Sequence, residues 1–154
     1  MKGRGNVVLK KAAASGEFGR GTMIVPTYAD GFDNFYQSRI VAETGAGTGG
    51  LTVETVPLDS LVQRPEDVSF IKVDAEGHEP AVLQGAGALL SARRAVWLVE
   101  APGDPDDAET TTSQVFQVFS KHGYAARSWT GTELAAVSPQ RKTVNVVFLP
   151  PERL

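Results

Sequence analysis

Hydrophobic and polar positions follow their most regular pattern between residues 70 and 100. Phe70–Val73 is a mostly apolar run that leads into Asp74, and Val96–Val99 is a second apolar run that leads into Glu100. Between the two runs, apolar residues recur at helical spacing after Pro80: Val82, Leu83, Ala86, Leu89 and Leu90. Proline fits the first turn of a helix, where its missing N–H leaves no hydrogen bond unmade. The stretch therefore predicts a strand, a helix and a parallel strand, which form a βαβ unit.

Shorter patterns on the N-terminal side predict three further strands. These lie at Val7–Leu9, Thr22–Thr27 and Leu51–Val56, where β-branched and other apolar residues are frequent. A short helix is predicted over Pro57–Val62, with Asp59 as its cap. The residues between 28 and 50 are the least regular and include a glycine-rich stretch.

The C-terminal third of the chain predicts one helix and a strand pair. Apolar residues at helical spacing mark the helix, with Thr112 or Ser113 as its cap and Gly123 at its end. Tyr124–Trp129 and Thr143–Leu149 are predicted strands separated by a loop, and we expect them to pair antiparallel.

Composition narrows the class of protein. The chain has 154 residues, of which 42% are hydrophobic and 21% charged, which is typical of one small globular domain. Cysteine is absent, so disulfides and thiolate metal sites are excluded. His78 and His122 are the only histidines and lie far apart in the sequence, so we expect no metal site, although carboxylates could still hold a hard cation. The net charge of −3 argues against a nucleic-acid or membrane partner, and no apolar run reaches the roughly 18 residues of a membrane span. We expect a cytoplasmic protein.

Acidic side chains follow both strands of the predicted βαβ unit. Asp74 and Glu76 follow the first strand, Glu100 ends the second, and His78 and Glu79 lie at the start of the helix. Ligands of open α/β sheets bind beyond the carboxyl ends of the strands. Acids there can bind a ribose hydroxyl, orient a cationic ligand or accept a proton, and His78 could act as a base. The alternative is structural, because acids in any first helical turn interact favourably with the helix dipole.

Lys72 is unusual within an otherwise apolar strand. A buried lysine is rare unless it is paired with an acid. We therefore expect Lys72 to form an ion pair with an acid; the alternative is that it marks a partly open edge of the sheet.

Several segments resemble the FkbM-type methyltransferase family. The most specific is F-I-K-V-D-A-E-G-H-E at residues 70–79, which is similar to the family pattern F-I-K-[IV]-D-x-E-G-x-E. V-L-Q-G-A at 82–86 is similar to the family's helix motif V-L-x-G-A, and V-P-L-D-S-L at 56–61 to its preceding element. Residues 96–100 and 146–150 resemble later strands of the family, and Asn6–Ser15 resembles a strand ending in a small-residue turn. The resemblance extends over about residues 6–150 of a single domain, 1–154.

The resemblance implies a fold, a cofactor and a set of site residues. The fold is an α/β class I methyltransferase, a Rossmann-like sheet with strand order 3-2-1-4-5-7-6 and an antiparallel C-terminal pair. The cofactor is S-adenosylmethionine, and the acceptor is a hydroxyl of a small metabolite or glycan. The catalytic residues implied are Asp74, Glu76, His78 and Glu79, and the cofactor-binding residues are Asp74, Ala14 and Ser15.

By the same resemblance the chain is N-terminally truncated. It begins at the third strand, and neither the first strand with its D-x-G-A-N-x-G loop nor the second strand is found. We therefore expect weak binding of S-adenosylmethionine by this chain alone. We also expect an exposed sheet edge at Phe70–Asp74 that permits self-association. The alternatives are a non-catalytic remnant or interaction module of the same fold, and a nucleotide-binding α/β domain, which is disfavoured because no phosphate loop precedes a helix.

The glycine-rich stretch at Gly45–Gly49 offers a second candidate cofactor loop. Together with the apolar Ile40–Val41 it is similar to the E-x-G-x-G-x-G loop of methyltransferases in general. That motif requires a helix immediately afterwards, whereas here the β-branched Leu51–Val56 and then Pro57 follow. We interpret the stretch as an ordinary hairpin or loop.

Overall fold

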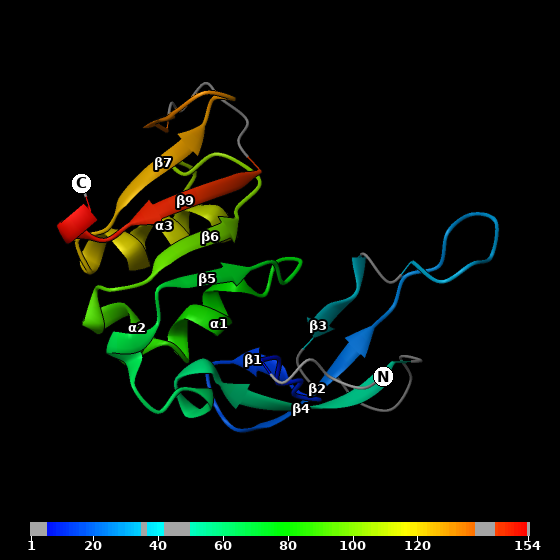
Figure 1. Ribbon diagram of the computed structural model, residues 1–154. Helices are drawn as coiled ribbons and strands as arrows, with labels where there is room; N and C mark the ends of the chain where they lie inside the picture. The colour runs from blue at the N-terminus through cyan, green and yellow to red at the C-terminus, as the bar shows by residue number, and fades with distance from the viewer. Residues whose placement is uncertain (1–5, 35–36, 42–49, 138–143, 154) are drawn as a thin grey trace.

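The chain folds into two β-sheets and a small number of helices (Figure 1). The computed structural model describes residues 6–34, 37–41, 50–137 and 144–153. The predicted α/β class is therefore confirmed, but the described strands do not form one continuous sheet. The Gly45–Gly49 stretch lies outside the described residues.

The smaller sheet contains four strands from the first third of the chain. They are β1 (Ala13–Ser15), β2 (Gly19–Ile24), β3 (Arg39–Val41) and β4 (Leu51–Pro57), in the order β1-β4-β2-β3. β1 is parallel to β4, while β2 is antiparallel to both β3 and β4.

The larger sheet contains five strands from the rest of the chain. They are β5 (Phe70–Val73), β6 (Val96–Glu100), β7 (Ala125–Trp129), β8 (Leu134–Ala136) and β9 (Asn145–Leu149), in the order β5-β6-β9-β7-β8. β5 and β6 are parallel, as the βαβ prediction requires, and β7 and β9 form the predicted antiparallel pair.

The helices are short. The α-helices are α1 (Glu79–Gln84), α2 (Gly87–Ala92) and α3 (Thr111–Lys121), and the 3-10 helices are η2 (Leu58–Leu61), η3 (Pro65–Asp67) and η4 (Pro151–Arg153). In the described residues no helix is both long and apolar enough to cross a membrane.

The hydrophobic core lies on one face of the larger sheet. Trp97 of β6 is paired with Phe148 of β9, so their side chains point to the same face. Phe119 of α3 stacks on Phe148 at 3.8 Å between ring centroids and meets Trp97 edge-on at 5.5 Å. The same face carries Val73 of β5, which is buried beside Val82 of α1. The described helices thus cover this face, whereas Phe70 and Lys72 point to the other face and are exposed.

The predicted helix after Pro80 is divided into α1 and α2. The division falls at Gly85, where an added Cβ would lie 2.0 Å from the carbonyl oxygen of Ser15. Gly85 is therefore required by the close approach of the β1 backbone, and its own carbonyl accepts a hydrogen bond from the N–H of Asp59 at 2.9 Å. The helix is interrupted at this contact because the backbone of β1 lies where the next turn of a continuous helix would be.

Two predicted helix caps were wrong. Asp59 caps no helix of its own; its carboxylate accepts hydrogen bonds from the N–H groups of Ala88 and Leu89, at 2.8 and 3.1 Å, and so caps α2 from 30 residues away. The cap of α3 is Thr110, whose hydroxyl accepts the N–H of Ser113, rather than Thr112 or Ser113 themselves. Gly123 does end that helix, with a φ of 78°.

Two predicted strands were also misplaced. Val7–Leu9 is exposed and forms no strand with any other described residue; the first strand is Ala13–Ser15 instead, because those residues pair with β4. The strand predicted at Thr22–Thr27 begins earlier, at Gly19, because its pairing with β4 extends from Gly19 to Met23. A third strand, Arg39–Val41, was not predicted as a separate element; it forms a hairpin with β2.

β5 lies at an edge of the larger sheet. Among the described residues it pairs with β6 alone, and β1 pairs with β4 rather than with β5. In Figure 1 the arrows of β4 and β5 point in opposite directions. The exposed sheet edge expected from the sequence is therefore present, whereas the single Rossmann-like sheet implied by the resemblance is replaced by two sheets.

Candidate functional site

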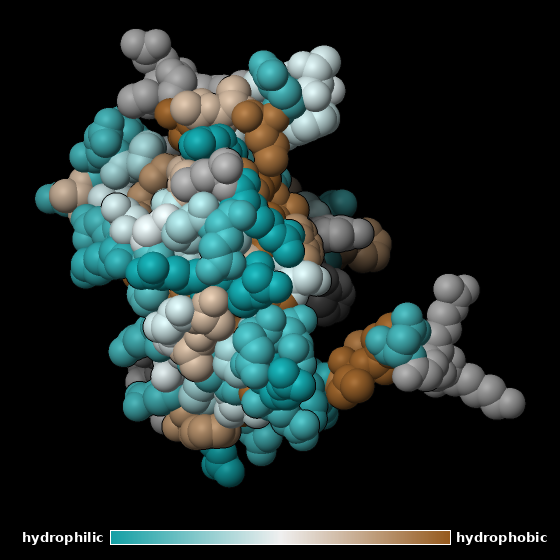
Figure 2. All heavy atoms as spheres, turned by 60° about the vertical axis from the view of Figure 1, so that its left-hand side comes forward, coloured by the Kyte–Doolittle hydropathy of each residue, from teal (hydrophilic) through white to brown (hydrophobic). Residues whose placement is uncertain are grey.

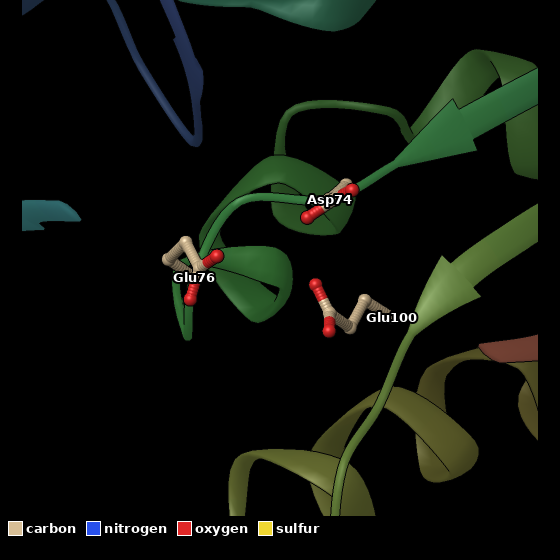
Figure 3. A group of neighbouring side chains, drawn as sticks. All are labelled: Asp74, Glu76 and Glu100. Carbon is tan, nitrogen blue, oxygen red and sulfur yellow. The ribbon is translucent and has the colours of Figure 1, made fainter. Parts of the chain in front are cut away.

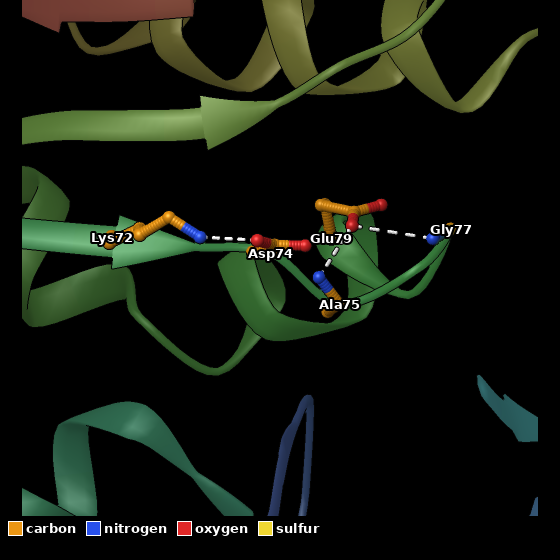
Figure 4. Close-up of polar contacts among 5 residues, drawn as sticks. All are labelled: Lys72, Asp74, Ala75, Gly77 and Glu79. Atoms are coloured by element: carbon orange, nitrogen blue, oxygen red, sulfur yellow. Dashed lines mark hydrogen bonds and ion pairs between the residues drawn. The ribbon is translucent and has the colours of Figure 1, made fainter. Parts of the chain in front are cut away.

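The turn after β5 is held in place by one buried carboxylate. Glu79 is 2% exposed, and its Oε1 accepts the N–H of Ala75 at 2.8 Å and the N–H of Gly77 at 3.3 Å (Figure 4). The turn passes through the left-handed region at Glu76 (φ 50°) and Gly77 (φ 92°). Such a backbone is unfavourable for a residue with a side chain unless the surroundings fix it. Glu79 supplies that fixation, and the turn displays the side chain of Glu76 to solvent.

Three carboxylates meet at the carboxyl ends of β5 and β6 (Figure 3). One oxygen each of Asp74, Glu76 and Glu100 lies within 4.8 Å of the others. Parallel pairing aligns Val73 with Val99, which places Asp74 next to Glu100. The predicted juxtaposition of these strand-end acids is therefore confirmed.

Lys72 of β5 forms an ion pair with one acid of this cluster. Its ammonium donates a hydrogen bond to Asp74 (Figure 4), as the sequence predicted. This hydrogen bond is the main cause that lowers the pKa of Asp74, with a further contribution from a hydrogen bond with Glu100. Asp74 is therefore the ionised member of the cluster at neutral pH.

Glu100 is the carboxyl group that holds a proton. Its hydrogen bond with Asp74, followed by burial and by the negative charges of Asp74 and Glu76, raises the pKa of Glu100 to about 7. Neighbouring carboxylates repel one another when all are ionised. The proton is therefore held most strongly by Glu100, whose negative charge would be least balanced by a nearby positive charge. The three carboxylates could also hold a divalent cation, which would compensate the same charge.

His78 connects this turn to the smaller sheet. Its Nε2 lies 3.1 Å from the hydroxyl of Ser15 at the end of β1. Burial lowers the pKa of His78, so the imidazole is neutral near pH 7 and can either donate to or accept from that hydroxyl. The contact joins a residue that the sequence assigned to catalysis and one that it assigned to cofactor binding.

A pocket of about 310 Å³ lies between β1 and β5. Its wall is mainly apolar, and Lys72, Asp74 and His78 supply the charged and polar part: the lining residues are Ala13, Ala14, Met23, Ser38, Ile40, Leu58, Ile71, Lys72, Val73, Asp74, Ala75, His78 and Val82. An apolar pocket with a few convergent polar groups is typical of a small-molecule site. Of the residues predicted to bind the cofactor, Ala14 and Asp74 line this pocket, and Ser15 reaches it through His78.

The structure separates the four candidate catalytic residues into different positions. Asp74 and Glu76 are exposed at the cluster, His78 is half-buried at the pocket, and Glu79 is buried beneath the turn. Glu100 was noted in the sequence as a strand-end acid but not grouped with the catalytic residues. The sequence did indicate that Glu100 lies near Asp74, because Glu100 ends the parallel strand next to the one that Asp74 follows.

One comparison with known proteins gives a match. The family model described as the Methyltransferase FkbM domain matches residues 8–126, which include the whole turn and all three clustered carboxylates. No curated protein and no solved structure matches the chain.

Proposed function

This chain belongs to the FkbM methyltransferase family, and on that premise we propose that it transfers a methyl group from S-adenosylmethionine to a hydroxyl of a small metabolite or glycan. The observation that carries the proposal is the carboxyl of Glu100, whose pKa is raised to about 7 beside the ionised Asp74. A general base is most effective when its pKa lies near the working pH.

We assign to Glu100 the role of general base, which takes the proton from the hydroxyl of the methyl acceptor. The ionised form of Glu100 would accept the proton of a hydroxyl bound at the cluster, which would activate that oxygen for methyl transfer. Asp74 and Glu76 would orient the acceptor molecule by accepting hydrogen bonds from its other hydroxyl groups. Glu79 is a positioning residue, because its carboxylate is engaged by the backbone of the turn.

The residues at the pocket suit a positively charged cofactor. S-adenosylmethionine supplies a methyl group activated on a sulfonium and carries an amino group and a ribose. Asp74 provides an anionic acceptor for its cationic and hydroxyl groups, while apolar residues such as Leu58 and Ile71 line the pocket beside it. Most of the chain's contribution is to hold donor and acceptor in line, which in methyl transfer supplies much of the rate enhancement.

We further propose a correspondence between the larger sheet and a Rossmann-like methyltransferase sheet. The order β5-β6-β9-β7 is the one expected for strands four, five, seven and six. The place beside β5 would then belong to the first strand, whose D-x-G-A-N-x-G motif is not found in this sequence. Weak binding of S-adenosylmethionine by the isolated chain follows, because that motif would otherwise cradle the cofactor.

The test is a transfer assay with isotopically labelled S-adenosylmethionine and a panel of sugars, oligosaccharides and small alcohols. Glu100→Gln should lower the rate by roughly 10²-fold or more, and the wild-type rate should rise with pH through about 7. Asp67→Asn, at an exposed acid that precedes β5 and so lies at the opposite end of that strand from Asp74, is the matched control and should leave the rate unchanged. Absence of transfer to every acceptor at saturating cofactor, or an unchanged rate in Glu100→Gln, would contradict the proposal.

A non-catalytic interaction module remains the second candidate function. The observation that favours it is the open edge of β5, which can pair with another strand. The transfer assay at saturating S-adenosylmethionine separates the two, because an interaction module without catalytic activity transfers no methyl group to any acceptor.

A further inference from the structure

The connection between β2 and β3 contains a tight hairpin over residues 26–34, called hairpin 26–34 below. The N–H of Tyr28 donates to the carbonyl of Phe32 at 2.8 Å, and the N–H of Gly31 closes the turn by donating to the carbonyl of Tyr28 at 2.9 Å. Gly31 has a φ of 88°, the left-handed conformation that three-residue hairpin loops use at this position. The hairpin therefore has a defined backbone that holds its side chains in fixed directions.

Two aromatic side chains form an exposed pair on this hairpin. Thr27 and Asp33 are bridged antiparallel, so the next residues, Tyr28 and Phe32, lie opposite each other and their side chains share one face. Tyr28 is 48% exposed and Phe32 is 73% exposed. Neighbouring exposed apolar groups, unlike isolated ones, are typical of binding surfaces. The pair is therefore a candidate contact surface for a ligand.

Hairpin 26–34 lies on the side of the molecule that carries the carboxylate cluster. In Figure 1 the loop between β2 and β3, blue to cyan, extends to the side towards which the arrows of β5 and β6 point. The side from which these strands start, which comes forward in Figure 2, is mainly hydrophilic over the body of the molecule. The strands that carry the hairpin also reach the candidate site, because Met23 of β2 and Ile40 of β3 line the same pocket as Asp74. The hairpin thus adjoins the place where we expect the methyl acceptor.

The charges around the aromatic pair narrow the class of ligand. Residues 23–38 contain no lysine, arginine or histidine, and their only charged side chains are Asp30 and Asp33. Phosphate groups and anionic membranes are bound by cationic side chains, which this stretch does not supply. The carboxylate of Asp30 accepts the N–H of Phe32 at 3.3 Å, but a carboxylate has about four acceptor sites and can also accept hydroxyl hydrogens. The hairpin therefore combines aromatic faces with an acceptor for hydroxyl groups.

A neutral sugar ring matches this combination. A pyranose has C–H bonds on its ring faces, whose weakly positive hydrogens are attracted to the negative face of an aromatic ring, and its hydroxyl groups donate to carboxylates. We propose that hairpin 26–34 is a subsite for a neutral pyranose ring of the methyl acceptor, which stacks on Tyr28 and Phe32. Asp30 accepts a hydrogen bond from a hydroxyl of the same ring. This subsite rests on the proposed function and narrows its acceptor to a glycan that has such a ring beside the sugar to be methylated.

Nuclear magnetic resonance of the isotopically labelled chain tests sugar binding without S-adenosylmethionine. The probes are maltose, cellobiose, lactose and mannobiose at millimolar concentrations, and sorbitol, which has hydroxyl groups but no ring, is the control ligand. At least one disaccharide should shift the backbone amide signals of Tyr28 and Phe32, whereas sorbitol should not. Absence of these shifts with every disaccharide, or equal shifts with sorbitol, overturns the proposal. Signals that move with protein concentration instead of sugar would assign the aromatic pair to a contact between copies, and they overturn it as well.

Substitutions test whether the two rings carry the binding. Tyr28→Ala and Phe32→Ala should each raise the dissociation constant of the disaccharide by about fivefold, whereas Phe32→Tyr keeps the ring and should bind like the wild-type chain. Trp129→Ala is the matched control, because Trp129 is an aromatic residue that is 58% exposed on β7, outside the hairpin. Unchanged binding in both alanine variants, or an equal loss in Trp129→Ala, overturns the proposal.

The transfer assay separates this subsite from the proposed function. Tyr28→Ala and Phe32→Ala should raise the KM for a disaccharide acceptor by about fivefold and leave kcat unchanged, because the subsite binds a part of the acceptor that does not react. The KM for glycerol, which has no ring, should stay the same. Equal changes for both acceptors overturn the subsite. Absence of transfer by the wild-type chain contradicts the proposed function instead, because the sugar-dependent shifts are measured without transfer.

Discussion

Replacing Glu79 by alanine distinguishes a structural from a directly catalytic role for this carboxylate. In the native chain its Oε1 accepts two backbone N–H groups, at 2.8 Å from Ala75 and 3.3 Å from Gly77. Gly77 is exposed, so water can replace the longer bond at little cost, whereas Ala75 is half-buried and loses its partner. An unsatisfied buried donor costs about 1–3 kcal/mol, and hydrogen bonds to a charged acceptor lie towards the upper part of that range.

We therefore expect Glu79→Ala to lower the free energy of unfolding by about 2–3 kcal/mol. For a domain of this size that corresponds to a melting temperature lower by roughly 4–12 °C. Urea unfolding followed by circular dichroism measures the first quantity, and a thermal scan measures the second. Glu79→Gln keeps an oxygen acceptor for Ala75 and should lose about 1 kcal/mol or less.

The control for these variants is Glu109→Ala, because Glu109 is an exposed glutamate whose removal should change stability by less than about 0.5 kcal/mol. If Glu79→Ala is as stable as the wild-type chain, the carboxylate does not hold the turn, and the argument from the two hydrogen bonds is wrong. Equal losses in Glu79→Ala and Glu79→Gln would show that its charge, rather than its acceptor oxygen, stabilises the fold.

Three further outcomes are expected. The pKa of Glu100 is raised from 4.5 to about 7, so the stability contributed by its proton is full below about pH 4.5 and is lost as the pH rises through about 7. In urea unfolding at a series of pH values, Glu100→Gln should therefore lack this decline in the free energy of unfolding. Identical pH profiles for the variant and the wild-type chain would contradict the assignment. Asp59→Ala should cost about 1 kcal/mol in the same assay by uncapping α2, with Asp59→Asn intermediate, and a null effect would refute the long-range cap. Gly85→Ala should destabilise the fold by more than about 2 kcal/mol, because its new methyl group would lie 2.0 Å from the carbonyl oxygen of Ser15. Gly87→Ala, which meets no such obstacle, should stabilise the fold by up to about 1 kcal/mol. Effects of the same sign would contradict the close approach of Gly85 to Ser15.

Local sequence determined the elements whose stabilising contacts are close along the chain. The run from Phe70 to Glu79 predicted a strand, a tight turn and a helix start. The charge of Lys72 within an apolar strand predicted that it pairs with an acid; the partner is Asp74, although Lys72 is exposed rather than buried. The parallel strand ending at Glu100 followed from the same βαβ pattern. These features depend on strand alternation, helical periodicity and the placement of proline, all of which are readable within a few residues.

Tertiary structure decided the features that depend on partners distant in sequence. Nothing near Asp59 indicates that it caps a helix 30 residues later, and only the approach of the β1 backbone explains why the helix after Pro80 divides at Gly85. Val7–Leu9 has the composition of a strand but no partner strand among the described residues, so composition alone misplaced the first strand. The pKa of Glu100 likewise depends on how near folding brings the other carboxylates. A side chain's type is fixed by sequence, but hydrogen bonding and electrostatic interaction depend on distance, and these distances are set by the packing of the whole chain.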